Sequence, residues 1–446
     1  MRPYVPLGIL YISSYLELHG YENEVFDATF SSFEKLKKQL LLQRPAVVGI
    51  YTNLMTKLNV LKIIGFVKGS KELFDTKVVL GGPEVRNHVE KFLEHGADLL
   101  VLGEGEQTML ELVEHLDGKT SKQLNEVFGI AYKDGDEKII RTPSRPNIRN
   151  VDELPFPNRS KVDLQLYFNA WKNKHGESAA SVSTMRGCPY TCKWCSRAVY
   201  GQSYRRRSAK LVVDELKWIQ QHFSVDTIWF VDDVFTISHK WLREFADELQ
   251  LRKVKIRYEC ISRSDRMSEE VVRLLKESGC FRVWIGAESG SQNVIDAMDR
   301  RVDVSNVREM ILLAKKHGIQ AGTFIMVGYP GETDADVQET LQHLKLSDPD
   351  HYTITVAYPI KGTPLYQEVE HQFTEMLPWE SSTDRQIDFK RNYNRKYYDY
   401  AVRWIYNEMA LHNILKKERS NLAKRVGFKM KALVSRSIMK FEMIRS

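Results

Sequence analysis

The chain has few cysteines and no long apolar run. Five of its 446 residues are cysteine, and three of the five are clustered, so a disulfide framework is not expected. This usage favours a reducing, cytoplasmic location. No apolar stretch reaches the roughly 18 residues that a membrane-spanning helix needs. The N-terminal segment has an apolar middle but lacks a small-residue cleavage site, and we do not interpret it as a signal peptide.

Acidic residues are scarce in the last part of the chain. Residues 385–446 hold 16 Lys and Arg against 5 Asp and Glu, a net charge of +11, whereas the whole chain carries +7. Such a region can make peripheral contact with an anionic membrane or bind an acidic or lipidic substrate. No nucleic-acid partner is expected, because no recognised binding module accompanies the charge.

Three cysteines, Cys188, Cys192 and Cys195, have the spacing C-x3-C-x2-C. Three thiolates can hold one iron–sulfur cluster and leave one iron open to a further ligand. A structural zinc site normally has four Cys or His ligands, and neither His175 nor His222 has a zinc-type spacing to the trio. Zinc completed by a distant histidine is the minor alternative.

Short apolar strands alternate with helical patterns over residues 1–146. The expected strands are 24–27, 46–51, 77–81 and 99–102, and the expected helices are 7–19, 33–43, 58–68, 85–95 and 106–116. This alternation predicts a doubly wound α/β domain built on a parallel sheet. A hairpin with an Asp134-Gly135 turn is expected over 127–142, and residues 147–179 are expected to form a linker.

Glycine and polar residues follow three of these strands, at the edge where a doubly wound sheet binds ligands. Glycine lets the backbone approach a ligand closely, and helix N-termini present N–H groups. Each segment alone is typical of an ordinary turn, but the three together favour a binding crevice. The candidate residues are Thr52, Asn53, Thr56, Gly81, Gly82, Pro83, Gly103, Glu104, Gly105 and Glu106.

A second series of strands and helices covers residues 180–365. The expected strands are 180–185, 227–231, 255–261, 282–287, 320–327 and 352–357, with helices at 211–222, 239–251, 269–278, 304–317 and 334–346. Six such units predict a partial (β/α)6 barrel, whose chemistry gathers at the carboxyl ends of the strands. Those ends carry the cysteines, Asp232 and Asp233, Arg263 and Asp265, Glu288 and Ser289, and residues 328–332.

Three segments of the first region, LGILYISSYLELHGYENEVFD, VVLGGPEV and VLGEGEQT, resemble the cobalamin-binding domain of cobalamin-dependent radical S-adenosylmethionine enzymes. This family includes the anaerobic magnesium-protoporphyrin ester cyclase and radical methylases. The resemblance implies a cobalamin site at the ten residues named above. Two features of that domain are absent: the first strand, which would precede Arg2, and a D-x-H-x-x-G motif with its cobalt-binding histidine.

Four segments of the second region, MRGCPYTCKWC, FVDDVF, WIGAESGS and GTFIMVGYPGET, resemble motifs of the same family. The resemblance implies that the three clustered cysteines bind a 4Fe-4S cluster and that S-adenosylmethionine chelates its open iron. It places Trp194 at the adenine, and Asp232 and Asp233 at the ammonium group. Arg263, Glu288 and Ser289 are further expected contacts of S-adenosylmethionine, and no catalytic side chain is assigned.

Structural roles are the alternative for several of these residues. Asp232, Asp233 and Asp265 can cap the helices that follow them, and Glu288 can be a salt-bridge partner. The run 205–207, three consecutive arginines, is expected to be solvated, although one of them can reach a cofactor carboxylate.

The family implies that a reduced cluster cleaves S-adenosylmethionine to a 5'-deoxyadenosyl radical, and that cobalamin serves methyl transfer to an unactivated carbon of a small-molecule substrate. An electron donor such as flavodoxin or ferredoxin is the implied partner. The alternatives are radical cyclisation or oxidation without methyl transfer, or a metal-stabilised module that docks on a membrane or nucleic acid. Methylthio transfer needs a second cluster, for which Cys260 and Cys280, expected to be buried, are too few.

Residues 366–446 are expected to form a basic helical region with helices at 388–416 and 421–443. Aromatic and apolar side chains at helical spacing more often pack into a core than bind a ligand. In the first helix they are Tyr393, Tyr397, Tyr400, Ile405 and Leu411, and in the second Leu422, Val426, Met430, Leu433, Val434 and Ile438.

Overall fold

A computed structural model describes residues 3–416 and 422–446, and the chain divides into two compact units. The first unit comprises Met1–Pro189, Ser196–Trp229 and Leu377–Thr383, and the second comprises Tyr190–Cys195, Phe230–Met376 and Asp384–Ser446. Arg2 and Asn421, two positions named in the sequence predictions, lie outside the described residues. No helix within 3–416 or 422–446 is long and apolar enough to cross a bilayer.

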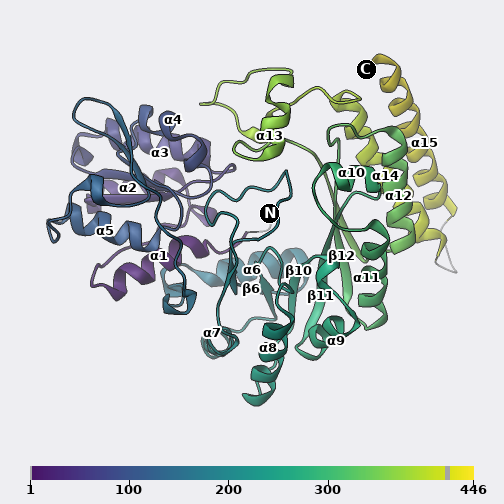
Figure 1. Cartoon of the computed structure of the whole chain (residues 1–446), viewed down its shortest axis with the longest axis horizontal. Coiled ribbons are helices and arrows are strands. Elements are labelled where there is room, and N and C mark those ends of the chain that lie inside the picture. The colour runs from purple at the N-terminus through teal and green to yellow at the C-terminus, as the bar shows by residue number, and fades with distance from the viewer. Residues whose placement is uncertain (1–2, 417–421) are drawn as a thin grey trace. The chain divides into compact units, whose positions relative to one another are not determined.

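A five-stranded sheet with the order β1-β2-β3-β4-β5 forms the core of the first unit (Figure 1). Strands β1 (Val47–Tyr51), β2 (Lys77–Gly81) and β3 (Leu99–Val101) are parallel, and the hairpin β4 (Ile130–Lys133) and β5 (Ile139–Arg141) is antiparallel. The helices of this unit are α1 (Leu7–Leu18), α2 (Phe33–Gln43), α3 (Lys57–Gly69), α4 (Val89–Glu94), α5 (Glu106–Leu116), α6 (Leu164–His175) and α7 (Ala209–His222). The expected doubly wound α/β architecture is confirmed, and the hairpin extends the sheet.

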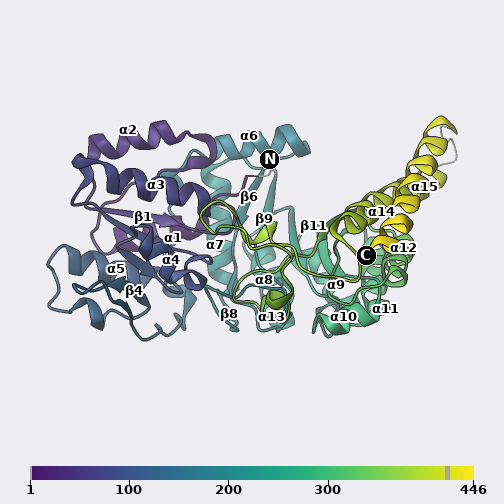
Figure 2. The same cartoon turned by 90° about the horizontal axis from the view of Figure 1, so that it is seen from above.

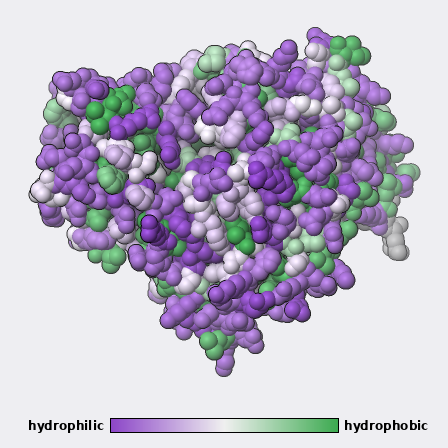
Figure 3. Space-filling model, in the orientation of Figure 1, coloured by the Kyte–Doolittle hydropathy of each residue, from purple (hydrophilic) through white to green (hydrophobic). Residues whose placement is uncertain are grey.

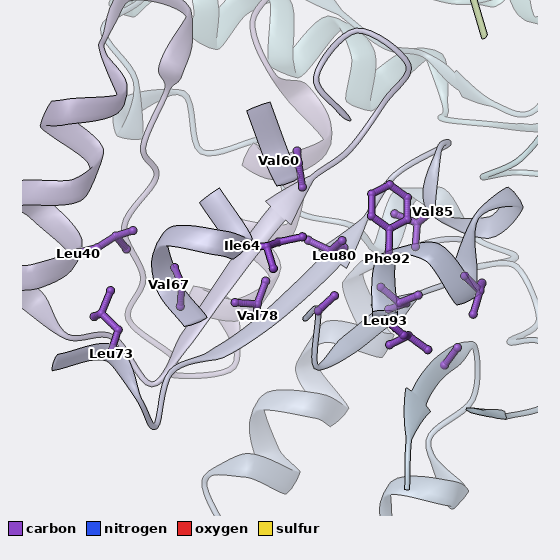
Figure 4. Close-up of a cluster of buried hydrophobic side chains, with 14 residues drawn as sticks. Leu40, Val60, Ile64, Val67, Leu73, Val78, Leu80, Val85, Phe92 and Leu93 are labelled. Atoms are coloured by element: carbon purple, nitrogen blue, oxygen red, sulfur yellow. The ribbon is translucent and has the colours of Figure 1, made fainter. Parts of the chain in front are cut away.

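Two hydrophobic clusters cover the two faces of this sheet. Val78 and Leu80 of β2 lie in one cluster with Ile64 of α3, as Figure 4 shows. Val79, the residue between them, lies in the other cluster with Leu16 of α1. Successive side chains of a strand point to opposite faces. The apolar run of β2 is therefore buried on both sides, which is why its sequence does not alternate.

The second unit contains four parallel strands in the order β13-β12-β11-β10. They are β10 (Tyr258–Ser262), β11 (Cys280–Glu288), β12 (Gln320–Val327) and β13 (His351–Val356), and the helices are α8 (His239–Leu251), α9 (Glu269–Glu277), α10 (Gln292–Ala297), α11 (Val304–Lys316), α12 (Asp334–Ser347) and α13 (Pro364–Val369). In the first unit β6 (Ala179–Val182) neighbours β9 (Thr227–Phe230), and β7 (Met185–Arg186) pairs with β8 (Arg205–Arg206). The six strand-helix units follow one another along the chain, as the partial barrel requires.

Three predicted elements differ in the structure. Residues 24–27 form no strand, because Asp27 instead caps the short helix Ala28–Phe30 and accepts a hydrogen bond from the Tyr167 hydroxyl. The helix predicted over 85–95 is interrupted at His88, whose ψ of 38° is not helical. The strand predicted over 180–185 is divided between β6 and β7. The sequence patterns also did not predict α6 and α10.

Two long helices, α14 (Arg395–Leu415) and α15 (Leu422–Arg445), lie side by side in the C-terminal region (Figures 1 and 2). Helix α14 buries Tyr397 and Ile405 as expected, whereas Tyr400 and Leu411 are only partly buried. The expected core role of the α15 stripe is wrong. That helix instead buries Ala432, Ser435, Met439 and Glu442, and five of the six predicted stripe residues are exposed.

Candidate active site

The clustered cysteines occupy an irregular segment that follows β7. Cys192 is buried, Cys188 is partly buried and Cys195 is exposed, and none of the five cysteines of the chain forms a disulfide. In the second unit the N–H of Cys195 donates to the carbonyl of Cys192 at 3.2 Å. This turn keeps the two residues close together.

Residues 298–301 support the cysteine segment within the second unit. The Thr191 hydroxyl donates to the carboxylate of Asp299 at 2.6 Å, and the N–H of Lys193 donates to the carbonyl of Met298 at 3.1 Å. The guanidinium of Arg300 lies 5.8 Å from the centre of the Trp194 ring. Trp194 is partly buried and packs against a hydrophobic cluster that includes Met298. The segment is therefore fixed on both sides of Cys192.

Two buried arginines donate to the sulfur of Cys192. Nη1 of Arg263 and Nη1 of Arg300 each lie 3.7 Å from Cys192 Sγ. Arg263 also donates to the carbonyl of Arg300 at 2.8 Å and to the carboxylate of Asp265, and the ring of Tyr190 lies 3.8 Å from its guanidinium. Both guanidinium groups can therefore donate to this sulfur when it serves as a metal ligand.

Within the part of the chain that the structure describes, Arg300 is a buried cation with one unpaired guanidinium nitrogen. Its side chain is 8% exposed, and its Nε has no hydrogen-bond partner among residues 3–416 and 422–446. Burial lowers the pKa of Arg300, but the negative charges of Glu288 and Cys192 outweigh this effect and raise it. Arg300 is therefore charged, and its Nε can donate to a further acceptor.

Glu288 ends β11 in a strained backbone conformation. Its φ is +64°, and the pairing of β11 with β12 shifts register between Gly286 and Glu288. A bulge re-aims a side chain, and a left-handed non-glycine residue costs about 1–3 kcal/mol. Its carboxylate lies 3.7 Å from Arg300, the salt-bridge contact that the structural alternative expected. Burial raises the pKa of Glu288, although Arg300 and Arg263 act in the opposite direction.

Gly286 allows Arg300 to reach this position. A Cβ on Gly286 would lie 2.4 Å from Nη2 of Arg300, closer than non-bonded atoms approach. With glycine there, the same Nη2 donates to the Gly286 carbonyl at 2.9 Å.

Asp232 and Asp233 follow β9, and neither caps the next helix. The N-cap of α8 is Ser238, whose hydroxyl accepts from the N–H of Trp241, so the capping alternative is wrong for both residues. Asp232 is buried and Asp233 is exposed. Protein nevertheless surrounds the Asp233 carboxyl closely enough that loss of hydration, together with the charge of Asp232, raises its pKa.

Asp265 and Ser289 have structural partners. Asp265 pairs with Arg263, and the N-cap of α9 is Ser268, so capping is also wrong for Asp265. The Ser289 hydroxyl shares a hydrogen bond of 3.1 Å with Thr340 of α12.

In the first unit, the strand-end segments share one edge of the sheet. The N–H of Thr52 donates to the carbonyl of Gly81 at 2.7 Å, and the N–H of Glu84 donates to the carbonyl of Thr52 at 3.3 Å. Gly82 has a φ of +108°, and a Cβ there would lie 2.5 Å from the Thr52 carbonyl oxygen. Only glycine fits at this contact. Pro83, next along the chain, is partly buried.

The turn after β1 is closed by its own side chains. The Thr56 hydroxyl accepts from the N–H of Asn53 at 2.9 Å, and the Asn53 side chain accepts from the N–H of Thr56 at 3.0 Å. Tyr51 and Met55 are 40% and 66% exposed beside this turn. The edge therefore presents apolar side chains on a rigid turn.

Glu104 and Glu106 use their carboxylates in a buried ion-pair network of the first unit. Arg186 donates to Glu104 at 2.9 Å and to Glu106, and Arg205 donates to the second oxygen of Glu104 at 2.6 Å. The N–H of Ile148 donates to Glu104 at 2.7 Å. Gly103 and Gly105, the glycines of this loop, are partly buried. The network ties the loop after β3 to the strand that leads into Cys188.

The predicted solvation of residues 205–207 is wrong. Arg205 pairs with Glu104, as described above. Arg206 donates to the Thr184 hydroxyl at 2.9 Å, and Arg207 pairs with the buried carboxylate of Glu215. A run of like charges in sequence normally indicates a solvated surface, but here each guanidinium has a separate carboxylate or hydroxyl partner.

Arg300 and Arg391 were missed by the sequence predictions, whereas Glu332 belongs to the strand-end residues 328–332 that they named. Arg300 lies in the segment Met298–Val302, whose three charged residues are typical of a surface turn. The sequence therefore does not indicate that Arg300 is buried. Glu332 is buried in the GYPGET motif, where its carboxylate accepts from the N–H of Gly328 and burial raises its pKa to about 8. Arg391 donates to the Gly328 carbonyl at 2.8 Å.

Family models match two parts of the chain. The "Radical SAM superfamily" model matches residues 182–344, and the "B12 binding domain" model matches residues 3–113. The first range contains the cysteine segment with Arg263 and Arg300. The second contains all ten strand-end residues proposed for cobalamin.

Known proteins resemble the chain over most of its length. An uncharacterized methyltransferase of Pyrococcus horikoshii is 30% identical over 81% of this chain and 78% of its own length. The anaerobic magnesium-protoporphyrin IX monomethyl ester cyclase of Rubrivivax gelatinosus is 28% identical over 82% of this chain and 66% of its own length. The structure of the cobalamin-dependent S-adenosylmethionine radical enzyme OxsB with aqua-cobalamin has a TM-score of 0.76 and 18% identity, covering 99% of this chain and 70% of that protein.

The residues present fit the cofactors of this family. The three cysteines, which form no disulfide, and the two arginines beside Cys192 suit an anionic thiolate-bound cluster. The orphaned Nε of Arg300 suits a carboxylate ligand. The exposed Tyr51 and Met55 suit a large macrocycle at the sheet edge. The cofactors are a 4Fe-4S cluster, S-adenosylmethionine and cobalamin. The chain belongs to the radical SAM superfamily, in the group of cobalamin-dependent enzymes that carry a B12-binding domain ahead of the radical SAM domain.

Proposed function

We propose that this enzyme transfers a methyl group to an unactivated carbon of a small-molecule substrate. The observation that carries the proposal is the presence of a B12-binding segment and a radical SAM segment in one chain that is 30% identical to a protein named as a methyltransferase. When bound, the reduced cluster and S-adenosylmethionine supply a 5'-deoxyadenosyl radical, and cobalamin supplies the methyl group.

The protein's part in this reaction is to bind the cofactors through thiolate, carboxylate and aromatic side chains. Cys188, Cys192 and Cys195 would hold the cluster. Asp232 and Asp233 would accept hydrogen bonds from the ammonium group of S-adenosylmethionine, and Trp194 would lie at the adenine. Further contacts of S-adenosylmethionine are assigned to Arg263, Glu288 and Ser289.

Cobalamin contacts are assigned to the three strand-end segments of the first unit. The carboxylates of Glu104 and Glu106 already pair with arginines, so these two residues would act through their backbone. The contacts are assigned to Thr52, Asn53, Thr56, Gly81, Gly82, Pro83, Gly103, Glu104, Gly105 and Glu106.

The domain limits that go with this function are 1–146 for the cobalamin-binding domain, 147–179 for a linker, 180–365 for the barrel and 366–446 for the C-terminal region. The absence of disulfides supports a cytoplasmic location, where flavodoxin or ferredoxin would donate the electron. The basic C-terminal region supports an acidic or lipidic substrate and peripheral contact with a membrane.

Radical cyclisation or oxidation without methyl transfer is the second candidate function. Its support is the 28% identity to the magnesium-protoporphyrin ester cyclase. The two functions differ in the products of S-adenosylmethionine. Methyl transfer consumes a second molecule of it and yields S-adenosylhomocysteine, whereas cyclisation yields 5'-deoxyadenosine alone.

The deciding experiment uses the full chain, reconstituted anaerobically with iron, sulfide and cobalamin. We expect the visible spectrum of retained corrinoid and, after addition of reductant and S-adenosylmethionine, both S-adenosylhomocysteine and 5'-deoxyadenosine. 5'-Deoxyadenosine without S-adenosylhomocysteine would support the cyclisation function instead. Folded protein that retains no corrinoid would contradict methyl transfer, and bound zinc in place of iron would support a metal-stabilised binding module.

A further inference from the structure

Helix α15 exposes an apolar stripe along its whole length. Seven large apolar side chains of this helix are more than half exposed, from 53% for Val426 and Val434 to 87% for Ile444. Figure 3 shows hydrophobic side chains among hydrophilic ones on the part of the surface that α15 occupies in Figure 1. The seven residues are Leu422, Val426, Met430, Leu433, Val434, Phe441 and Ile444.

The seven side chains share one face of the helix. At about 100° per residue, all seven positions fall within a sector of about 120°. The buried residues Ala432, Ser435, Met439 and Glu442 fall on the opposite side. A helix that only completes a core exposes its polar face, whereas α15 exposes an apolar face and buries the opposite one.

Polar contacts hold the buried face of α15 within the second unit. Arg436 forms a bidentate pair with Asp334 of α12, at 2.5 and 2.6 Å, and its guanidinium lies 4.9 Å from the Trp404 ring of α14. Glu442 accepts from Asn394 at 2.9 Å and pairs with Lys396 at 2.8 Å. The orientation of the helix about its own axis is thereby fixed, and the apolar stripe faces away from its unit.

Cations line both edges of the stripe. By the same helical geometry, Lys429 and Lys440 lie at one edge, and Lys431 and Arg445 lie at the other. All four are exposed. The whole helix carries seven Lys and Arg residues and one glutamate. This glutamate, Glu442, is buried and pairs with Lys396. No exposed carboxylate therefore interrupts the positive charge of α15.

We propose that α15 docks on an anionic membrane surface, with the stripe among the lipid headgroups and acyl chains and the flanking cations at the phosphates. The charge complementarity favours lipid: an apolar stripe between two rows of long cationic side chains is the pattern of interfacial helices, since lysine and arginine extend past buried apolar surface to reach phosphate. This proposal rests on the peripheral membrane contact proposed above for the C-terminal region, and it assigns that contact to the exposed face of α15.

The test is flotation of the full chain with vesicles of phosphatidylcholine, with and without phosphatidylglycerol. We expect binding only to the anionic vesicles, and weaker binding at high salt. The double variant Val426→Glu/Leu433→Glu should lower the bound fraction by about tenfold or more, as should Lys429→Glu/Lys440→Glu. The matched controls are Leu251→Glu, 76% exposed on α8, and Lys240→Glu, 87% exposed on the same helix. Both controls should bind as wild type does.

Two results would overturn the proposal. One is the absence of binding to anionic vesicles, or binding that the stripe variants leave unchanged. The other is a dimer in solution that Val426→Glu/Leu433→Glu dissociates, because a second copy would then cover the stripe. All substituted positions are exposed, and thermal melts confirm that each variant is folded. Binding is measured without reductant or S-adenosylmethionine, so failure here leaves the proposed reaction intact.

Discussion

Arg300 donates from Nη1 to the sulfur of Cys192 at 3.7 Å, from a position 108 residues further along the chain. The contact joins the loop after α10 to the centre of the cysteine motif. Because the guanidinium is buried beside the carboxylate of Glu288, its charge acts on the sulfur with little screening by water. The electrostatic surroundings of the cluster ligand therefore depend on a residue outside the motif.

Replacing Arg300 by methionine should make the reduction potential of the cluster more negative. The variant loses an N–H donor and a positive charge beside a ligand sulfur, and both stabilise the reduced cluster. The measurement is a potentiometric titration of the reconstituted protein. Arg273→Met is the matched control, because Arg273 is 63% exposed and pairs with Glu277 on α9, and its potential should equal that of the wild type. Equal potentials for Arg300→Met and wild type would refute the assigned role.

Gly286→Ala should reproduce the Arg300→Met effect without removing the arginine. The new Cβ would lie 2.4 Å from Nη2 of Arg300 and displace the guanidinium from Cys192. We expect a potential between those of wild type and Arg300→Met, measured in the same titration. Gly65→Ala, in a helical position with nothing within 4 Å of the added carbon, is the control and should leave the potential unchanged.

Arg186→Met should destabilise the first unit by about 3–5 kcal/mol, because it leaves two buried carboxylates without their shared cation. Loss of the guanidinium affects Glu104 and Glu106 together. Thermal unfolding of the full chain measures the effect as a lowered Tm. Lys37→Met removes an exposed pair with Glu34 and should change stability by about 1 kcal/mol or less. Similar Tm values for the two variants would contradict a stabilising role for the network.

Glu332 should make stability fall as the pH rises. Burial raises the pKa of this carboxyl from an ordinary value near 4.5 to about 8, so the folded chain holds a proton there that the unfolded chain releases. The stabilisation that this proton provides is lost between about pH 4.5 and 8. Glu332→Gln keeps a neutral acceptor for the Gly328 N–H, so its Tm should exceed that of wild type by several degrees at about pH 8.5, and the difference should shrink as the pH falls and vanish near about pH 4.5.

The exposed Glu339→Gln on α12 is the control for this pH series. Its Tm should follow that of wild type at every pH. A constant difference between Glu332→Gln and wild type across the range would show that Glu332 does not change its protonation between the folded and unfolded states.

The sequence predicted the elements whose patterns are local. Strand β2 and helices α2, α5 and α8 have the predicted limits, because apolar runs and helical spacing depend on neighbours in the chain. Residues 24–27 have the composition of a strand but no neighbouring strand to pair with, and their backbone follows the cap at Asp27 instead. Pairing partners are a tertiary property that a short segment does not encode.

The candidate site was predictable only in its motifs. The cysteine spacing and the polar strand ends are visible in the sequence, but the burial of Arg207 and Arg300 is not. A buried arginine is stable only because carboxylates from other parts of the chain lie beside it, as Glu288 does for Arg300. The exposure of the α15 stripe was mispredicted for a similar reason, since its spacing is equally typical of a core-facing helix.

The most direct test of the account is release of 5'-deoxyadenosine by anaerobically reconstituted protein given reductant and S-adenosylmethionine. Wild type should bind about four iron and four sulfide per chain and release the nucleoside, whereas Cys192→Ala should lose both properties. Cys260→Ala, a buried cysteine of β10 outside the motif, is the control and should behave as wild type does. Release from Cys192→Ala at the wild-type rate would contradict radical chemistry at this cysteine motif.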